Sequence, residues 1–544
     1  MRRARLLGAV AAALLASLIL FWNLGGYALW NYDEARHAEV AREIFSATDV
    51  RGWVVPSLNG RPYYDKPILF YWLVSAAYGV GGVDELSARA VPAIAALVTV
   101  LATYAWAAGV WGTAPALAAA AVLVTAGEFA ALGRYANLDM LLTLWITLGL
   151  FAVYRWSERA ERGASLVPAA VCAALGTLTK GLVAPVLVAG IGLAYLAVSG
   201  RLGLLRRARL ARATLAFVAV AGPWHFAAGL IDGNYLWELF ARHHFERYFE
   251  ATRDHLHAAP FYYYLPMLIL CFLPWSVMLP VTVVRTFARA RRGDPERFCA
   301  CWVLGILVFF SLASGKLGTY ILPALPALAL LTGRCIAGIV GREALAPVER
   351  RLLAAGIATA ATLFIVAAPV LVGLSARIYD SAWMQTSFLA LAVIPVGLLL
   401  AAFLRRGWLH ATPVALAGGM TITLLLFYTW GAPAISAVRS EASLAARIAA
   451  VDGTEPRPLV VAYSVRTPSL LFYLRQPVRE VEYAPALTRV LSKHPLVYVV
   501  TSPKHVPALL ASGALYAWHT GAHRVLYAST PAPPNGSAPP HGSP

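Results

Sequence analysis

Charged residues are scarce in this chain. They make up 13% of its 544 residues, about half of the ~25% that is usual for a soluble domain. Hydrophobic residues reach 59%, above the ~45–50% of soluble proteins, and the mean hydropathy is +0.65. Because a soluble protein of this size has too little interior to bury so much apolar surface, the composition excludes a disordered chain and a soluble multidomain protein.

Lysine and cysteine are also rare. Arginine supplies most of the positive charge, and the lysines are only five: Lys66, Lys180, Lys316, Lys493 and Lys504. The five cysteines lie in or beside apolar segments and form no C-x-x-C motif. We therefore expect neither a disulfide framework nor a cysteine zinc cluster. Because lysine is so uncommon here, each lysine is a candidate for a specific role.

Long apolar segments fill most of the chain, and thirteen of them predict membrane-spanning helices, since a bilayer crossing needs ~20 apolar residues. Their approximate limits are 6–23, 88–110, 113–131, 138–154, 165–179, 181–199, 213–231, 262–284, 299–314, 320–340, 353–374, 384–404 and 411–431. The segments 165–179 and 181–199 could form one broken span, but Thr179-Lys180-Gly181 favours two short ones. The first segment could pass for a signal peptide, yet no clear small-residue cleavage site follows, so we expect a retained span.

The basic residues behind the net charge of +18 are distributed along the chain as this membrane topology requires. Arginines gather after the even-numbered spans, at 155–162, 201–212, 285–297, 342–351 and 405–406, and only the very short connection near Trp111 lacks them. Since basic loops stay in the cytoplasm, the N-terminus is predicted to be cytoplasmic and the C-terminal segment extracytoplasmic. Topology explains the charge, so we predict a multi-pass membrane protein that contacts membrane lipids and no nucleic acid.

The transmembrane domain is predicted over residues 1–431, with two long extracytoplasmic loops at 25–87 and 232–260. In the first loop we expect an amphipathic helix at 33–47, with Asn31 as its N-cap, and a short interfacial helix at 67–80. After the transmembrane domain, we predict a small α/β domain at 432–529. Its strands are expected at 459–464, 478–483, 496–501 and 524–528, and its helices at 468–474 and 506–512. The Pro/Gly/Ser-rich tail 530–544 is predicted to be disordered.

Ionisable residues that this topology places at the membrane edge lie on the extracytoplasmic side. They are Asp33, Glu34, Arg36, His37, Tyr63, Tyr64, Asp65 and Lys66 in the first loop, Asp139 and Lys180 at span ends, His243, His244 and Arg247 in the second loop, and Lys316 and Tyr320 between the ninth and tenth spans. Such groups are costly near lipid and are functional candidates by default. A snorkelling side chain or a structural ion pair is the alternative for each one alone.

Cations near the interface, with carboxylates and aromatic residues beside them, suit a lipid-linked phosphate. The headgroup can lie at the interface while its tail lies among the spans, and lysine or arginine then neutralises the phosphate where water is scarce. If a sugar is attached, the lipid phosphate is the leaving group. Carboxylates can then stabilise an oxocarbenium-like transition state or deprotonate an acceptor hydroxyl.

The motifs occur in a characteristic order. They are Asp33-Glu34-x-Arg36-His37, Trp53-x-x-Pro56-x-x-Asn59-Gly60, Tyr64-Asp65-Lys66-Pro67, Leu138-Asp139-Met140, Lys180-Gly181-Leu182, Pro223-Trp224-His225, His244-Phe245-x-Arg247, Leu273-Pro274-Trp275 and Gly315-Lys316-Leu317-x-Thr319-Tyr320. This set resembles the bacterial aminoarabinose transferases, which belong to the protein O-mannosyltransferase-like group of membrane glycosyltransferases. The resemblance implies an all-α GT-C fold of about thirteen transmembrane helices with a small extracytoplasmic α/β domain.

The resemblance also implies the reactants and the roles of residues. The donor would be a sugar on undecaprenyl phosphate, and the acceptor would be lipid A at the outer face of the inner membrane. Asp33 and Asp139 would be the catalytic carboxylates, and the donor phosphate would be held by Arg36, Lys66, Lys180, Lys316 and Tyr320. Further site residues would be Glu34, His37, Tyr63, Tyr64 and Arg247. Asp65 and His244 could hold a structural divalent ion such as zinc, although no metal is needed for a lipid-linked donor.

Other functions are left open by the sequence. A related enzyme could transfer sugar to protein Ser/Thr or to another cell-envelope glycan. A transporter of a lipid-linked saccharide would show internal repeats and broken midplane helices, and neither is evident in the sequence. A sensor would need a functional soluble domain, but the predicted α/β domain has no Gly-rich phosphate loop and no nucleophile elbow. The sequence therefore favours an integral membrane glycosyltransferase.

Overall fold

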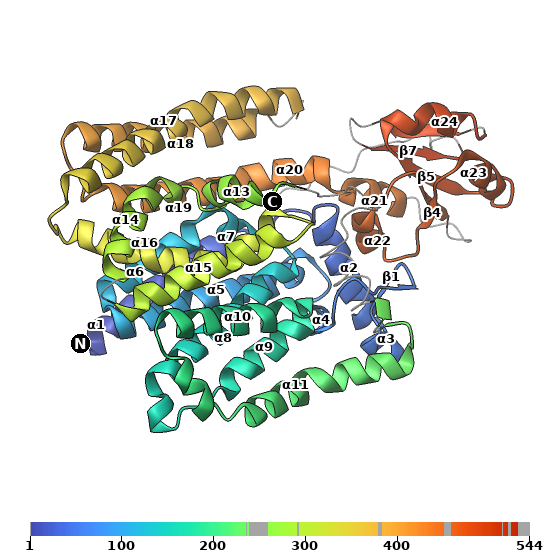
Figure 1. The fold of residues 1–544 in the computed structure, drawn as a ribbon. Coiled ribbons are helices and arrows are strands. Elements are labelled where there is room, and N and C mark those ends of the chain that lie inside the picture. The colour runs from blue at the N-terminus through green and yellow to red at the C-terminus, as the bar shows by residue number, and fades with distance from the viewer. Residues whose placement is uncertain are drawn as a thin grey trace.

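Helices form most of the molecule, and the long ones lie side by side in one bundle (Figure 1). The computed structural model describes residues 2–235, 237–238, 259–290, 293–378, 383–450, 458–513, 515–520 and 524–530. The bundle comprises α1 (Arg2–Phe21), α5 (Glu85–Val110), α6 (Thr113–Thr125), α8 (Leu138–Arg159), α9 (Val167–Lys180), α10 (Val183–Val198), α11 (Leu210–Ile231), α13 (Tyr264–Cys271), α14 (Leu279–Ala290), α15 (Asp294–Leu312), α16 (Leu325–Val340), α17 (Pro347–Ile378), α18 (Trp383–Arg405) and α19 (Thr412–Leu426). Every predicted span therefore coincides with helix.

The spans differ from the prediction in length and shape. Within the described part of the chain, seven helices are long and apolar enough to cross a membrane, or eight if the bent pair is one span. That pair is Phe261–Cys271 with Trp275–Arg289, bent by 105°, so the helix predicted at 262–284 is broken. The helix predicted at 113–131 is shorter than expected, because α6 ends at Thr125 and a separate short helix, α7 (Gly127–Leu132), follows. Residues 165–199 form two short helices, as expected.

The first long loop folds against the end of the bundle that lies opposite the N-terminus (Figure 1). It contains α2 (Asp33–Phe45), α3 (Val50–Val54), the hairpin strands β1 (Ser57–Leu58) and β2 (Arg61–Pro62), and α4 (Leu69–Gly81). The turn between the strands is Asn59-Gly60, with φ of 55° and 70°, which suits the two-residue turns of hairpins. Both helices agree with the prediction, but the expected Asn31 cap is wrong. Tyr32 occupies the N-cap position and makes no side-chain capping bond.

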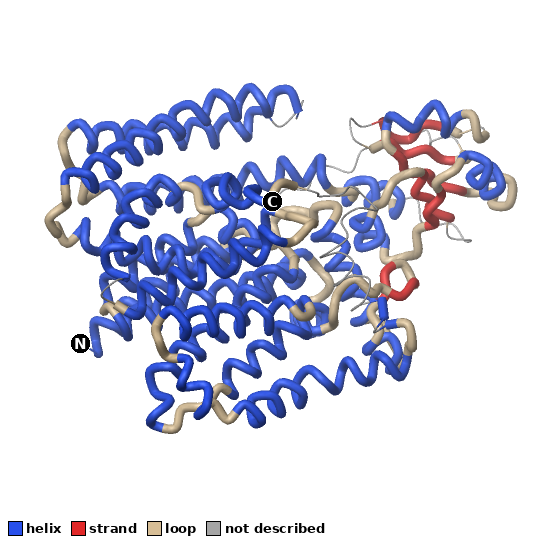
Figure 2. Tube along the Cα trace, in the orientation of Figure 1, coloured by secondary structure: helices blue, strands red, loops and turns tan. Residues whose placement is uncertain are grey.

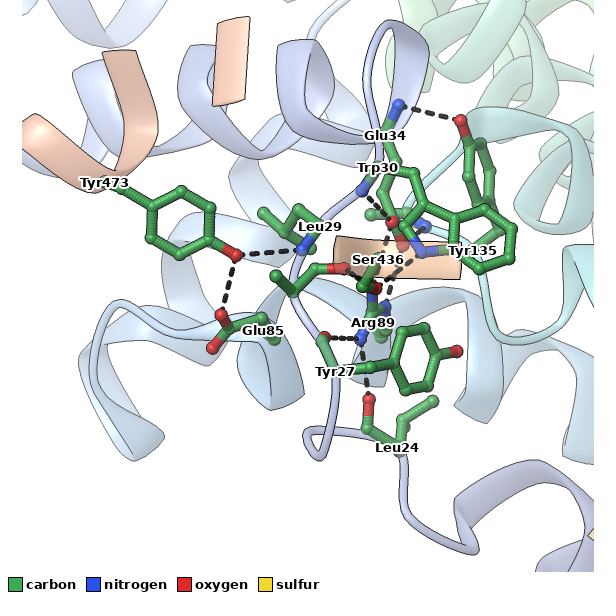
Figure 3. A network of polar contacts seen from close by, with 12 residues as sticks. Leu24, Tyr27, Leu29, Trp30, Glu34, Glu85, Arg89, Tyr135, Ser436 and Tyr473 are labelled. Carbon is green, nitrogen blue, oxygen red and sulfur yellow. Dashed lines mark hydrogen bonds and ion pairs between the residues drawn. The ribbon is translucent and has the colours of Figure 1, made fainter. Parts of the chain in front are cut away.

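A buried ion pair holds this loop to the bundle (Figure 3). The Arg89 guanidinium of α5 donates to the Glu34 carboxylate at 2.8 Å, and both side chains are at most 1% exposed. Arg89 also donates to the carbonyl oxygens of Leu24, Tyr27 and Ala28. A buried charge needs such complete pairing, because losing one partner leaves an uncompensated ion. The pair therefore fixes residues 24–34, and with them the start of α2.

The C-terminal α/β domain is the only part of the described chain with a sheet of more than two strands (Figure 2). Its strands are β3 (Leu459–Tyr463), β4 (Arg479–Val481), β5 (Val497–Thr501), β6 (Tyr516–Thr520) and β7 (Val525–Ala528), in the order β4-β3-β5-β7-β6. Strand β3 is parallel to β4 and β5, and β7 is antiparallel to β5 and β6. Buried side chains cluster on each of the two faces of the sheet. The four predicted strands are present, and β6 is an addition.

Helices connect this domain to the last span and cover its sheet. They are α20 (Ala432–Arg439), α21 (Ala442–Ala449), α22 (Pro468–Leu474), α23 (Ala484–Leu491) and α24 (Val506–Leu510). The first loop is bonded to this domain at two places. The Tyr473 hydroxyl accepts a hydrogen bond from the Leu29 amide at 2.8 Å, and the Asn59 side chain both donates to and accepts from the backbone of Val478. The predicted tail lies outside the described residues.

Candidate functional site

The first turns of α2 present an exposed carboxylate and a largely buried guanidinium. Arg36 donates to Asp33 at 2.6 Å, and the Asp33 side chain remains 52% exposed. The same guanidinium lies 3.6 Å from the Asp65 carboxylate. It also lies over the rings of Tyr32 and Tyr63, at 4.9 and 5.8 Å from their centres. Arg36 holds one oxygen of Asp33, and the half-exposed side chain leaves the carboxylate accessible to a bound molecule.

His37 marks the place where three predicted cations gather. Its ring is buried, and Nδ1 lies 2.9 Å from the Tyr71 hydroxyl on α4. Burial lowers the pKa of His37 well below its usual range, and the nearby charges of Arg36, Lys66 and Lys180 lower it further. The histidine is therefore neutral near pH 7. Three positive charges within electrostatic reach of one ring form a site suited to an anion.

Lys180 and Asp139 form an ion pair between the end of α9 and the start of α8. The Asp139 side chain is 6% exposed and that of Lys180 is 17% exposed. The ammonium also lies 4.7 Å from the centre of the Tyr320 ring, which is a cation–π contact. Asn137 caps α8 by accepting a hydrogen bond from the Asp139 amide. The helix start, the carboxylate and the lysine are thus fixed relative to one another.

Lys66 lies in the turn before α4, and the beginning of the second long loop holds this turn in place. The ammonium donates to the carbonyl oxygen of Asp65 at 3.0 Å. The Tyr235 hydroxyl donates to the Lys66 carbonyl oxygen at 3.1 Å, and the Tyr64 hydroxyl donates to Asp232 at 2.9 Å. The rings of Tyr64 and Tyr235 are 5.5 Å apart. These contacts position the lysine beside α2.

Lys316 lies in the connection between α15 and the 3-10 helix Gly318–Ala324, which also contains Tyr320. Its side chain is 6% exposed, and the ammonium donates to the carbonyl oxygen of Ala313 at 2.5 Å. Burial lowers the pKa of Lys316. The Tyr264 hydroxyl donates to the neighbouring Leu317 carbonyl oxygen at 3.2 Å. Lys316 is therefore placed by its own loop, four residues before Tyr320 in the chain.

The structure does not bring all of the predicted site residues together. Glu34 is bound to Arg89 inside the fold and does not face the cations. Tyr63 is buried, 6.2 Å from the Tyr71 ring, and contacts the site only through Arg36. Arg247 and His244 lie outside the described residues. The arrangement that remains has cations, an ion-paired acid and an exposed acid beside the bundle end, which suits an anionic headgroup at a membrane surface.

Comparisons with known proteins show what the whole chain is similar to. Residues 10–231 match the family model of dolichyl-phosphate-mannose-protein mannosyltransferase. Over 330 residues the chain is 34% identical to undecaprenyl phosphate-alpha-4-amino-4-deoxy-L-arabinose arabinosyl transferase 1 of Pseudomonas fluorescens, covering 59% of this chain and 57% of that protein. The chain is similar in sequence to the aminoarabinose transferases. The matched region spans little more than half the length of that curated relative.

The fold is similar to that of ArnT from Cupriavidus metallidurans. The crystal structure of ArnT in the apo state aligns with a TM-score of 0.79 and 26% identity, over 96% of this chain and 97% of that one. ArnT bound to undecaprenyl phosphate aligns with a TM-score of 0.81 and 24% identity, over 96% and 98% of the two chains. The predicted GT-C type fold with a small C-terminal domain is confirmed, and the chain is a multi-pass membrane protein.

The predicted metal pair stays a prediction. His244 lies outside the described residues, and the Asp65 carboxylate is 3.6 Å from the Arg36 guanidinium. Among the described residues, no group of three or more His, Cys, Asp and Glu side chains could hold a metal ion. A guanidinium beside the carboxylate supplies the positive charge that a cation would otherwise bring.

Sequence reasoning missed three tyrosines that contact the site residues. Tyr71 is the partner of His37, and Tyr235 fixes the Lys66 turn. Tyr135, in the loop before α8, accepts a hydrogen bond from the Glu34 amide at 3.1 Å. Tyrosines are common in this chain, with 24 occurrences, so no composition signal distinguished these three. The position of Tyr135 four residues before Asp139 was the one available signal.

Proposed function

We propose that this protein is an inner-membrane glycosyltransferase that moves 4-amino-4-deoxy-L-arabinose from undecaprenyl phosphate to lipid A. One observation carries the proposal. The Arg36 guanidinium pairs with the half-exposed Asp33 carboxylate at 2.6 Å and lies 3.6 Å from Asp65, the residue before Lys66. This juxtaposition provides a phosphate site next to a carboxylate at a membrane edge. The names of the relatives supply the identity of the sugar and the carrier.

The cations bind the phosphate of the donor. Hydrogen bonds from charged donors to a phosphate are short and strong, especially away from water. As the bond between the anomeric carbon and the phosphate oxygen breaks, its electron pair passes to the carrier phosphate. Lys66, Lys180 and Arg36 stabilise the extra negative charge, and they do so more in the transition state than in the bound donor. Undecaprenyl phosphate is the leaving group.

Asp33 acts on the sugar. Positive charge develops at the anomeric carbon as the bond to phosphate lengthens, and a nearby carboxylate stabilises it. Arg36 holds one oxygen of Asp33 at 2.6 Å, which fixes the direction of the carboxylate. If the acceptor is a phosphate, it is already ionised near neutral pH and needs no base. If the acceptor is a hydroxyl, Asp33 would also remove its proton.

Asp139 orients Lys180. The ion pair fixes the ammonium between the carboxylate and the Tyr320 ring. A lysine is a flexible point charge on a long side chain, so without this pairing the ammonium would sample several positions. We expect no metal to take part in the transfer, because the cations of the chain neutralise the phosphate. Dialysis against a chelator should therefore leave the transfer rate within about two-fold of its starting value, whereas removal of a catalytic metal ion would lower the rate far more.

Transfer to protein Ser/Thr is the second candidate, because residues 10–231 match the mannosyltransferase family model. Mass spectrometry of lipid A from matched strains with and without this gene separates the two. A lipid A mass that gains one aminoarabinose only when the gene is present supports the proposal. Unchanged lipid A together with glycosylated envelope protein would support the second candidate instead.

A further inference from the structure

The C-terminal domain contains none of the residues proposed for the transfer, yet it contacts the segment that leads into α2. Helix α22 packs against α2, and the two lie side by side in Figure 1. The Trp30 indole donates a hydrogen bond to the Ser436 hydroxyl at 2.7 Å (Figure 3). The Asn31 amide donates to the Arg439 carbonyl oxygen at 2.9 Å. The backbone just before Asp33 is thus bonded to helix α20.

Both polar atoms of the Asn31 side chain are bonded to this domain as well. The nitrogen donates to the Glu441 carboxylate, and the oxygen accepts a hydrogen bond from the Ser469 amide at 3.0 Å. Glu441 occupies the N-cap position of α21, and Ser469 belongs to α22. Their exposed fractions are only 2% and 0%. Because Asn31 is two residues before Asp33, this buried contact adjoins the proposed catalytic carboxylate.

Glu441 is the centre of the contact. The Arg524 guanidinium donates to one of its carboxylate oxygens at 2.9 Å. The Asn31 amide nitrogen and the Ser469 hydroxyl donate to the other oxygen. A buried carboxylate is tolerated when it is paired and hydrogen-bonded in this way, and a fully satisfied buried network is rigid. The position of Asn31 is therefore set by a charge that the C-terminal domain supplies.

The bundle attaches the same segment at Glu34, which pairs with Arg89 of α5 at 2.8 Å. The half-exposed Asp33 carboxylate is paired with Arg36, three residues further along the same helix. An ion pair within one helix does not place that helix relative to the rest of the protein. The contact at Asn31 is therefore a second attachment of the start of α2, and it comes from a separate domain.

We propose that Asn31 and Glu441 are positioning residues, through which the C-terminal domain sets the position of the Asp33 carboxylate against the sugar. A displacement of ~1 Å at a reacting group can cost ~10²-fold in rate. Donor binding depends less on this contact, because Lys66 and Lys180 lie on other elements of the fold. The inference rests on the proposed function, since the two residues act through Asp33.

The test uses the purified full-length protein with undecaprenyl phosphate-aminoarabinose and lipid A. Asn31→Ala removes the side-chain bonds between the first loop and α21 and α22, and leaves the pair of Glu441 with Arg524 in place. Asn31→Ala and Glu441→Ala should each lower kcat about 10- to 100-fold, with KM for the donor within about three-fold. The double variant should lose little more than the worse single variant, because the two side chains are in contact. Glu441→Gln should keep part of the rate, because its amide oxygen can still accept the Asn31 hydrogen bond.

Asn59→Gly is the matched control, because Asn59 makes another contact between the first loop and this domain. Its side chain is bonded to the backbone of Val478, and glycine suits the turn at this position, where φ is 55°. The kcat of Asn59→Gly should stay within about two-fold of wild type, the scale of a substitution away from the site. An equal fall of kcat in Asn59→Gly and Asn31→Ala would overturn the inference.

Asp33→Asn provides the background that separates positioning from folding. Asn31→Ala should lower the rate of this variant by no more than about two-fold, because the charge that Asn31 positions is gone. A full additional loss, a wild-type kcat in Asn31→Ala, or a loss of folded Asn31→Ala protein would each overturn the inference and leave the proposed function standing. A wild-type rate in Asp33→Asn, or no transfer by the wild type, would overturn the proposed function and the inference with it.

Discussion

The ammonium of Lys180 contacts the carboxylate of Asp139, 41 residues away in the sequence. The contact joins the end of α9 to the start of α8, and the Tyr320 ring lies on the lysine at 4.7 Å. The Lys180 ammonium at the end of α9 thus contacts side chains of both α8 and the 3-10 helix before α16. An ion pair so deep in the fold is strongly dependent on both of its partners, because removing one leaves the other unpaired.

Lys180 and Asp139 should behave as one unit in a double-mutant cycle. Asp139→Asn and Lys180→Ala should each lower donor use by about 10-fold or more, the loss expected for a charge-assisted contact. The double variant should lose little more than the worse single variant, because residues in direct contact are non-additive. Initial rates with purified donor provide the measurement. Losses that multiply would show that the two side chains act independently.

Asp33→Asn should fold normally and lose activity. The substitution keeps the shape of the side chain but removes its charge, and the N-cap position of α2 belongs to Tyr32. We expect transfer to fall by ~10²-fold or more, the usual range for such a catalytic group. Asp49→Asn is the matched control, because Asp49 caps α3 by accepting from the Gly52 amide and asparagine caps about as well. A rate for Asp33→Asn within a few-fold of wild type, at equal protein level, would remove Asp33 from the chemistry.

Lys66→Ala and Lys316→Ala should weaken donor use without unfolding the protein. Each contact between an ammonium and a phosphate is worth ~1.5–3 kcal/mol, or about 10- to 150-fold in KM or rate. Arginine at either position should rescue only part of the loss, because its planar fork differs from a point charge. Lys493→Ala, in the C-terminal domain, is the control and should leave donor use unchanged. The phosphate role is contradicted if both alanine variants use the donor as wild type does.

His37 should make the protein less stable in mild acid. Burial and the neighbouring cations lower its pKa in the folded protein, while in the unfolded chain it titrates near ~6.5. Below that pH the unfolded state binds a proton that the folded state does not, so stability falls as pH falls, by up to ~1.4 kcal/mol per pH unit. Unfolding midpoints between pH 7.5 and 5.5 measure this slope. His37→Tyr should flatten it and His494→Gln should not, so equal slopes in all three proteins would refute the assignment.

Much of the fold was predictable because local patterns determine it. The helix expected at 468–474 is α22 at its exact limits, and the interfacial helix expected at 67–80 is α4 (Leu69–Gly81). Both follow from runs of apolar residues between turn residues. Strand β6 was missed because His519 and Thr520 interrupt its apolar pattern. Its strand character comes from pairing with β7, which is a tertiary effect.

The site was predictable by residue type and not by contact. The scarcity of lysine drew attention to Lys66, Lys180 and Lys316, and the structure places the first two beside His37. Asn31 was expected to cap α2, but its side chain bonds instead to Glu441, 410 residues away. Glu34 was expected at the site, but Arg89 pairs with it inside the fold. No pattern in the neighbouring sequence shows that Asn31 and Glu34 bind such distant residues instead of capping a helix or contacting a ligand.

Transfer by the purified protein tests the central claim most directly. The protein in detergent is incubated with undecaprenyl phosphate-aminoarabinose and lipid A, and the products are resolved by liquid chromatography and mass spectrometry. The account predicts lipid A that has gained one aminoarabinose, together with an equal amount of free undecaprenyl phosphate, and ~10²-fold less of both with Asp33→Asn. Undecaprenyl phosphate release without modified lipid A, or equal product from wild type and Asp33→Asn, would contradict it.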